Sequence, residues 1–123
     1  MISPADVRSA DRRRNRVQPD VFAVRLVDGK QPSYPYDLTD VLLIIEVESP
    51  NNPQLDYQIK RKLYLSRGVP EYWIVNAAAQ IVSRWRAVDD PGAVFDRRIE
   101  WHPAGMPAPL VIDLPSLFDD ALG

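Results

Sequence analysis

The sequence contains no cysteine and a single histidine, His102, and both shortages exclude kinds of site. Without cysteine there is no disulfide framework, no thiol nucleophile and no thiolate ligand for zinc or an iron–sulfur cluster. One histidine excludes the helical zinc motif that needs two. His102 stands between Trp101 and Pro103, where we expect a structural role. The acidic and basic residues are therefore the main candidates for chemistry.

Long apolar segments are also missing from the sequence. The longest apolar run, residues 41–45, is far shorter than the roughly 20 residues of a membrane-spanning helix. The N-terminus has no apolar stretch of the kind found in signal peptides. Together with the lack of cysteine, these features predict a cytoplasmic protein in a reducing compartment, with no membrane partner.

A strong overall charge is absent as well, because 17 acidic residues oppose 15 basic residues and the net charge is −2. The bulk basic character of many nucleic-acid-binding domains is therefore missing. The charges are unevenly distributed, however, since residues 1–25 hold six arginines against three aspartates. Residues 56–68 hold four basic residues against one acid. Each cluster can form a local basic face or can be a solvated surface.

The length and composition predict one folded domain. A chain of 123 residues is ordinary for a single domain, which we expect to cover residues 1–123. Apolar residues make up 46% of the chain and charged residues 26%, which is typical of a globular protein and argues against disorder. The 12 prolines lie between the apolar runs and divide the chain into short elements.

The apolar runs predict a mixed sheet with a helix that connects two of its strands. Residues 41–47 are apolar on both faces, as in a central strand that is covered on both sides. The order of strand, helix and strand favours a parallel crossover to residues 72–75. The other expected elements are strands at 21–27, 80–88 and 94–101, an extended segment at 110–114 and a terminal helix at 116–122.

The connecting helix has clear start and stop signals. Asn52 is a suitable N-cap, Pro53 fits the first helical position, and Gly68 fits the left-handed position after the last turn. Three apolar residues recur at every fourth position and predict the stripe that faces the sheet. These residues are Leu55, Ile59 and Leu63. Asp56, Lys60 and Tyr64 form the adjacent stripe, from which Lys60 could reach the end of strand 41–47.

Several charged residues lie at the ends of apolar segments. Asp20 opens a strand directly after Pro19, and Glu46 and Glu48 share one face near the end of the most apolar strand. Acids in such places are costly to bury unless they are paired or bound to a cation. Carboxylate oxygens suit magnesium, which binds one or two carboxylates and keeps several waters.

Each of these residues also has a purely structural interpretation. Asp20 could cap a turn, Glu48 could already be exposed, and Glu46 could be a structural acid. Asp56 and Lys60 are spaced as a surface ion pair of one helix, which contributes only a few tenths of a kcal/mol. The aromatic side chains Trp73 and Trp85 are expected in the core.

Taken together, the motifs are more specific than any one of them. They are residues 17–21 (Val-Gln-Pro-Asp-Val), residues 45–50 (Ile-Glu-Val-Glu-Ser-Pro), the helical residues Asp56, Lys60 and Tyr64, and residues 68–75 (Gly-Val-Pro-Glu-Tyr-Trp-Ile-Val). From about residue 4 to the C-terminus, the chain resembles the Uma2 family of restriction endonucleases within the PD-(D/E)xK nuclease superfamily.

This resemblance implies a fold, a reaction and a set of site residues. The fold is α/β (α+β), with a restriction-endonuclease-like mixed β-sheet core and a crossover helix. The reaction is attack of water on a phosphodiester, which depends on Mg²⁺, with Mn²⁺ as a substitute. The implied catalytic residues are Asp20, Glu46 and Lys60, and the implied metal ligands are Asp20, Glu46 and the backbone carbonyl of Val47.

The chain departs from the family pattern in two ways. In many members of the superfamily a lysine follows the strand acid by two positions, where this chain has Glu48, so the helix would supply Lys60 instead. The chain is also expected to lack the usual N-terminal region of the family. A missing layer would expose apolar surface, which a homodimer could cover. A dimer would also suit cleavage of both DNA strands.

Two functions follow from these observations. The first is a metal-dependent DNA endonuclease that contacts phosphates through Arg61, Lys62 and Arg67. The alternative is a catalytically silent interaction module on the same fold. The joint presence of Asp20, Glu46 and Lys60 favours the nuclease, because these residues have no evident structural need to sit together.

Overall fold

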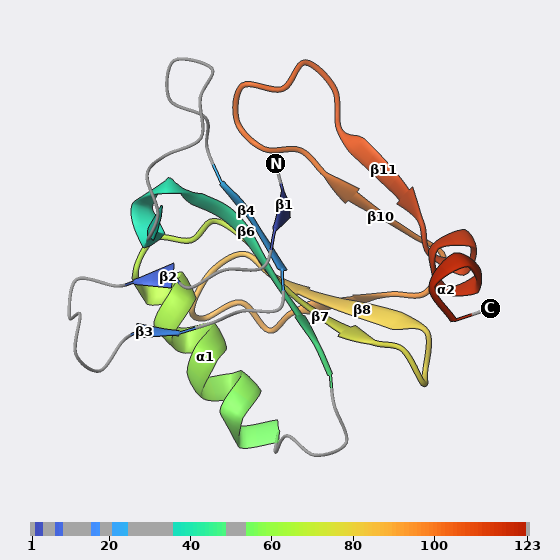
Figure 1. Ribbon diagram of the computed structural model, residues 1–123, viewed down its shortest axis with the longest axis horizontal. Helices are drawn as coiled ribbons and strands as arrows, with labels where there is room; N and C mark the ends of the chain where they lie inside the picture. The colour runs from blue at the N-terminus through green and yellow to red at the C-terminus, as the bar shows by residue number, and fades with distance from the viewer. Residues whose placement is uncertain are drawn as a thin grey trace.

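The computed structural model describes residues 2–3, 7–8, 16–17, 21–24, 36–48 and 54–122. Its largest sheet has six strands in the order β1-β4-β6-β7-β8-β9 (Figure 1). These strands are β1 (Ile2–Ser3), β4 (Val21–Val24), β6 (Val41–Val47), β7 (Tyr72–Asn76), β8 (Ile81–Trp85) and β9 (Ala93–Phe95). Most neighbouring strands are antiparallel, but β6 and β7 are parallel, so the sheet is mixed as predicted.

Smaller elements complete the fold. Two strands, β10 (Arg98–Trp101) and β11 (Leu110–Asp113), form an antiparallel pair, and the helix α2 (Leu114–Leu122) follows directly. A three-stranded sheet has the order β3-β2-β5 and consists of β3 (Arg16–Val17), β2 (Val7–Arg8) and β5 (Tyr36–Asp37). A short 3₁₀ helix, η1 (Leu38–Asp40), leads into β6. None of the helices in the described ranges could cross a membrane, given their length and polarity.

The crossover between the parallel strands is the helix α1 (Gln54–Ser66). Its end agrees with the sequence signal at Gly68, which has a φ of 98°. The Gly68 N–H donates to the Leu65 carbonyl and the Val69 N–H donates to the Tyr64 carbonyl. This pair of hydrogen bonds is the Schellman motif, which satisfies carbonyls of the last turn. The predicted crossover and helix end are both confirmed.

The face of α1 that contacts the sheet differs from the predicted stripe. Ile59 is 57% exposed, whereas Tyr57 and Tyr64 are 1% and 0% exposed. The helix is therefore rotated so that Tyr57, Lys60 and Tyr64 turn toward the sheet and Ile59 turns to solvent. The prediction that Ile59 belongs to the buried stripe was wrong, because two tyrosines fill more of the space above the strands than one isoleucine.

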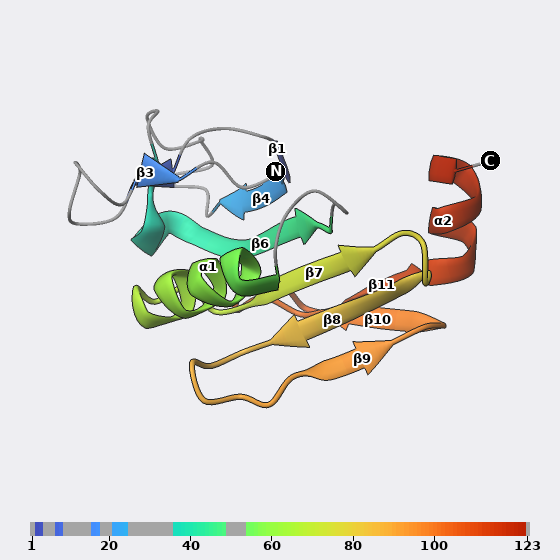
Figure 2. The same ribbon diagram turned by 90° about the horizontal axis from the view of Figure 1, so that it is seen from below.

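Two apolar cores lie on opposite faces of the large sheet. Figure 2 shows α1 on one face and the β10–β11 pair on the other. The first joins the sheet to α1 and includes Ile44, Tyr64 and Tyr72. The second joins the sheet to β10, β11 and α2, and includes Trp73 and Phe118. Alternate residues of β6 and β7 thus serve different cores, which explains why both strands are apolar on both faces.

The C-terminal third deviates from the prediction in its boundaries: β8 ends at Trp85 instead of residue 88, α2 begins at Leu114 instead of residue 116, and the strand expected at 94–101 is divided. A single strand was expected over residues 94–101, but the structure has β9 in the large sheet and β10 in the second sheet. The intervening residues, Asp96 and Arg97, form a bend. This break lets β10 leave the edge of the large sheet and cover its face, where Ile99 is 1% exposed.

Candidate active site at the end of the central strand

Glu46 lies near the end of β6 and is only 3% exposed to solvent. Ile44, two positions earlier, packs in the core between the sheet and α1, and Glu46 shares that face. An ionised carboxylate in such a place is stable only with partners of opposite charge or with hydrogen-bond donors. Glu46 is therefore a strong candidate for a functional acid.

Lys60 supplies a positive charge to this acid. Its Nζ lies 3.5 Å from Oε2 of Glu46, and the Lys60 side chain is 32% exposed. The Lys60 ammonium is therefore partly accessible to water while it contacts the buried Glu46 carboxylate. This contact to β6 favours the predicted site over a simple surface pair of Lys60 with the exposed Asp56.

Tyr57 contacts the neighbouring residue of the same strand. The Tyr57 hydroxyl donates a hydrogen bond to the Val47 backbone carbonyl, with 3.3 Å between the two oxygens. Tyr57 was not among the predicted site residues. The sequence placed the sheet-facing stripe on Ile59 instead, so a tyrosine beside it had no reason to stand out.

Asp20 lies outside the residues that the structure describes, so its predicted place in the site stays a prediction. Its chain neighbour Val21 is described, and it pairs with Ile45, the residue before Glu46. Glu48 is half-buried, and its N–H donates to the Val75 carbonyl at 2.8 Å, which keeps the end of β6 attached to β7.

The three predicted DNA contacts lie on or just after α1, but their surroundings differ. The Arg61 guanidinium carbon lies 4.7 Å from the centre of the Trp85 ring, a cation–π arrangement. Lys62 is exposed and Arg67 is half-buried. Lys62 is thus the most accessible of the three cations to a large ligand, while part of the Arg61 side chain is held over β8.

Tyr72 lies under α1 and close to this group. Burial raises the pKa of the Tyr72 phenol well above its ordinary value of 10.0, and the negative charge of Glu46 raises it further. Among the described residues, the Tyr72 hydroxyl has no hydrogen-bond partner. The phenol therefore stays protonated, and it cannot serve as a base near neutral pH.

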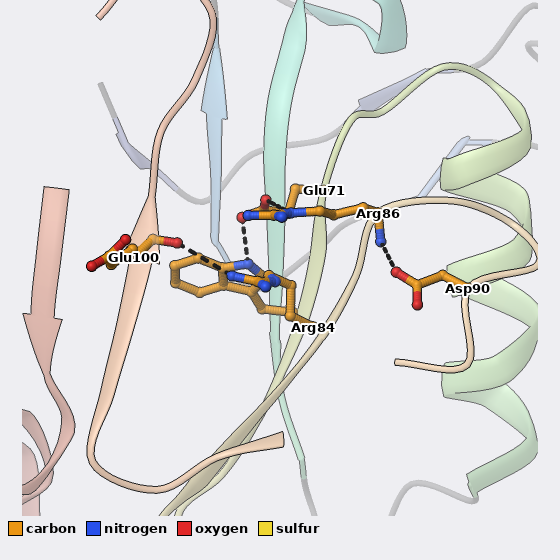
Figure 3. Close-up of polar contacts among 6 residues, drawn as sticks. Glu71, Arg84, Arg86, Asp90 and Glu100 are labelled. Atoms are coloured by element: carbon orange, nitrogen blue, oxygen red, sulfur yellow. Dashed lines mark hydrogen bonds and ion pairs between the residues drawn. The ribbon is translucent and has the colours of Figure 1, made fainter. Parts of the chain in front are cut away.

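A second buried acid, Glu71, lies directly before β7 and is 7% exposed. Its carboxylate accepts a hydrogen bond from the Trp73 indole at 2.8 Å and pairs with Nε of Arg86 at 2.9 Å. Figure 3 shows Arg86 lying along Glu71, with its backbone N–H bonded to Asp90. Because both carboxylate oxygens of Glu71 are held by side chains, this acid ties β7 to β8.

A large hollow occupies the opposite face of the sheet. Its volume is about 530 Å³ and only apolar residues line it. Val47 and Leu117, which are 45% and 44% exposed, lie at its border. The two faces of β6 thus present different chemistry, with a charged pair toward α1 and an apolar hollow toward α2.

The donors at the end of β6 are suited to a hard divalent cation. Glu46 offers carboxylate oxygens and Val47 offers a backbone carbonyl, both of which are oxygen ligands of the type that magnesium prefers. Within the described ranges, no group of three or more acids or histidines is close enough to bind a metal ion. A site with three such side chains would therefore need at least one from outside those ranges, such as Asp20.

Comparisons with known proteins identify the family and the fold of this chain. The Uma2 family model, described as "Putative restriction endonuclease", matches residues 2–114. A similar solved structure is that of "a putative nuclease belonging to DUF820 from Anabaena variabilis ATCC 29413", with a TM-score of 0.66 and 20% identity. The match covers 96% of this chain and 68% of that chain, and at this identity it shows a common fold. No curated protein matches this chain.

Proposed function

Because the chain belongs to the Uma2 family, we propose that it is a metal-dependent DNA endonuclease, a hydrolase that acts on phosphodiester bonds. The observation that carries this proposal is the contact between Lys60 and the buried Glu46. A carboxylate at the end of a central strand, with a lysine of the covering helix beside it, is a combination that can serve phosphodiester hydrolysis. The acid binds a cation, and the lysine stabilises negative charge.

Mg²⁺, or Mn²⁺ in its place, is the proposed cofactor. Glu46, the Val47 carbonyl and Asp20 would hold it, and their oxygen donors suit its chemistry. When bound, such an ion polarises the phosphate and activates water. Burial of Glu46 keeps competing water away from one side of the site and fixes the direction of its carboxylate.

Lys60 has a separate role in the proposed reaction. Its ammonium is partly exposed and can therefore contact a phosphate oxygen while it stays near Glu46. A fixed positive charge there stabilises the charge that develops on the phosphate during attack by water. The helix α1 sets this position, since Lys60 and Tyr57 lie on one face of it.

DNA is the proposed substrate, and the cations of α1 are its proposed contacts. Lys62 is exposed, Arg67 is half-buried just after the helix, and Arg61 lies over the Trp85 ring. Contacts of this kind go mainly to phosphates and carry little sequence information. We expect binding to weaken steeply with salt.

Cleavage of supercoiled plasmid in Mg²⁺ or Mn²⁺ tests the activity. The wild type is compared with Lys60→Met and Glu46→Gln, which keep side-chain size and remove charge. Glu100→Gln on β10 is the matched control, because Glu100 is exposed and far along the chain from the site. We expect nicking by the wild type and the control, and none by the two site variants.

Other outcomes would point elsewhere. Equal nicking by all four proteins would indicate a contaminating nuclease. A folded wild type that binds metal and DNA but never cleaves would favour the silent interaction module. Metal binding is measured separately by calorimetry, where Asp20→Ala should abolish the heat of binding. If Asp20→Ala binds as the wild type does, the proposed ligand set is wrong.

A homodimer is proposed as the working assembly, and a cytoplasmic location as its setting. The apolar hollow beside Val47 and Leu117 supports a partner on that face of the sheet. Two copies would bring two sites to one duplex, which would suit cleavage of both strands. Light scattering on the purified chain would give the mass of a dimer, and a monomeric mass at all concentrations would contradict this proposal.

A further inference from the structure

Tyr57 and Lys60 hold two consecutive residues of β6 from one face of α1. Lys60 contacts the Glu46 carboxylate, and the Tyr57 hydroxyl donates to the Val47 carbonyl. The two helical residues are three positions apart and therefore lie one above the other on the helix. The helix thus fixes both of the described groups that are proposed to bind the metal ion.

The Val47 carbonyl is directed away from the parallel neighbour strand β7. The N–H groups of Ile44 and Glu48 donate to carbonyls at and before β7, so these residues direct their backbone groups toward β7. Val47 occupies the alternate position, and its carbonyl is directed toward the β4 side. At this end of β6 it accepts the hydrogen bond from the Tyr57 hydroxyl of α1.

The Tyr57 side chain is well suited to hold this carbonyl. It is 1% exposed, so its ring is immobilised by packing, and a phenol has few rotatable bonds with which to move the hydroxyl. A carbonyl oxygen has two lone pairs, so it can accept one hydrogen bond and still bind a cation. The hydrogen bond then limits the directions in which the second lone pair can point.

From this geometry we infer that Tyr57 is a positioning residue, which orients the Val47 carbonyl for a divalent cation through its hydroxyl. The inference rests on the proposed metal-dependent function and adds to it a residue outside the ligand set. Residues that orient a metal ligand through a hydrogen bond typically contribute about 10-fold or more to metal affinity. The loss of the Tyr57 hydroxyl should therefore weaken metal binding while all proposed ligands remain.

The test is titration of the full chain with MnCl₂ by calorimetry, without DNA. Tyr57→Phe removes the hydroxyl and keeps the ring, and Tyr72→Phe is the matched control. Tyr72 is 0% exposed, and its hydroxyl has no hydrogen-bond partner in the described ranges. We expect Tyr57→Phe to raise the dissociation constant about 10-fold, and Tyr72→Phe to leave it unchanged.

A kinetic measurement distinguishes a positioning role of Tyr57 from a purely structural role. In Tyr57→Phe, plasmid nicking should need more Mn²⁺ to reach half its maximal rate, and the maximal rate should recover at saturating Mn²⁺. A purely structural role predicts an equal loss of rate at every Mn²⁺ concentration, and that result would overturn the inference. Equal Mn²⁺ affinity in Tyr57→Phe and the wild type would overturn it too, with the proposed function intact.

A spectroscopic measurement on the wild type covers the case in which Tyr57→Phe does not fold. The carbonyl carbon of Val47 and the ζ carbon of Tyr57 are labelled with ¹³C and followed during addition of Mg²⁺. We expect both signals to shift together with one dissociation constant. A shift of the Val47 signal with no change in the Tyr57 signal would overturn the inference about Tyr57 but not the proposed function. No binding of Mg²⁺ or Mn²⁺ by the folded wild type would overturn it together with the proposed metal dependence.

Discussion

The Nζ atom of Lys60 lies 3.5 Å from Oε2 of Glu46, although the two residues are 14 positions apart in the sequence. One belongs to α1 and the other to a strand of the sheet below it. The contact therefore exists only because α1 crosses the sheet over the end of β6. Its contribution to stability and to the proposed reaction can be measured separately.

Removal of the lysine charge should destabilise the fold. In Lys60→Met, the buried Glu46 loses its cationic partner, and the loss of one member of a fully buried ion pair costs about 3–5 kcal/mol. Since Lys60 is 32% exposed, water already screens the pair, and we expect a loss of about 2 kcal/mol. Urea unfolding of Lys60→Met, Glu46→Gln and the double variant would measure this.

The double variant provides the decisive comparison. With both charges absent, no uncompensated carboxylate is buried, so the double variant should be more stable than Lys60→Met alone. The coupling energy from the cycle should lie between about 0.5 and 3 kcal/mol. Strictly additive effects would show that Lys60 and Glu46 do not interact in solution.

Glu71 should be a stability residue with no effect on the reaction. Glu71→Ala leaves the Trp73 indole N–H and the Arg86 side chain without their common acceptor. An unsatisfied buried indole donor, together with the loss of an ion pair that is screened because the Arg86 side chain is 53% exposed, should cost about 2 kcal/mol. Urea unfolding would measure this loss, and Glu100→Ala, at an exposed position, should change stability by less than about 0.5 kcal/mol. A loss of metal affinity in folded Glu71→Ala would contradict the assignment.

Asp113 should make the stability of the C-terminal helix sensitive to acid. Hydrogen bonds from the Ser116 side chain and backbone lower the pKa of Asp113 below its ordinary value of 3.8. Because the folded-state pKa is lowered, the stabilisation is complete above about pH 3.8 and is lost as the pH falls through the folded-state value. Asp113→Ala should therefore lower the Tm at pH 7, with a smaller difference from the wild type at pH 3.

Calorimetric melting at several pH values would test this, with Asp120→Ala as the control. Asp120 lies in the last turn of α2, where the helix dipole does not favour an anion. That variant should not lower the Tm. If the difference in Tm between Asp113→Ala and the wild type were the same at every pH, the charge of Asp113 would not contribute to the stability of the start of α2.

Gly92 should not tolerate alanine. Its φ is +89°, and a Cβ there would lie 2.5 Å from Nε1 of Trp85. The strained backbone and the displaced Trp85 ring together should cost about 2 kcal/mol or more. The same displacement would disturb Arg61, which lies over that ring. Urea unfolding of Gly92→Ala checks this. An unchanged urea concentration at half unfolding would mean that the loop between β8 and β9 adjusts to the added methyl group without cost.

Much of the fold was predictable because its signals are local. The strand at 41–47, the crossover to β7 and the helix end at Gly68 each follow from a few neighbouring residues and all agree with the structure. The fold class was also predictable from motifs, since the family model and the similar solved structure confirm it. The break between β9 and β10 was not, because only the packing of β10 on the opposite face requires it.

The candidate site was predictable in part. Glu46 stood out as an acid in an apolar strand, and Lys60 was placed within its reach; the structure brings these two together. The roles of Asp20, Val47 and the cations of α1 stay predictions. The contacts of Tyr57 and Glu71 were not predicted. Each residue contacts a partner from another element, and no local sequence pattern marks such a partner.

The sequence by itself determined that residues 41–47 form a strand, that a helix connects this strand to β7, and where α1 ends, since backbone propensity and caps act over a few residues. The tertiary structure decided which face of α1 meets the sheet, and thereby brought Lys60 to Glu46 and Tyr57 to Val47. The physical reason is that a helix with apolar residues on several sides can rotate about its axis. Only the volume of Tyr57 and Tyr64 against the strands selects one rotation.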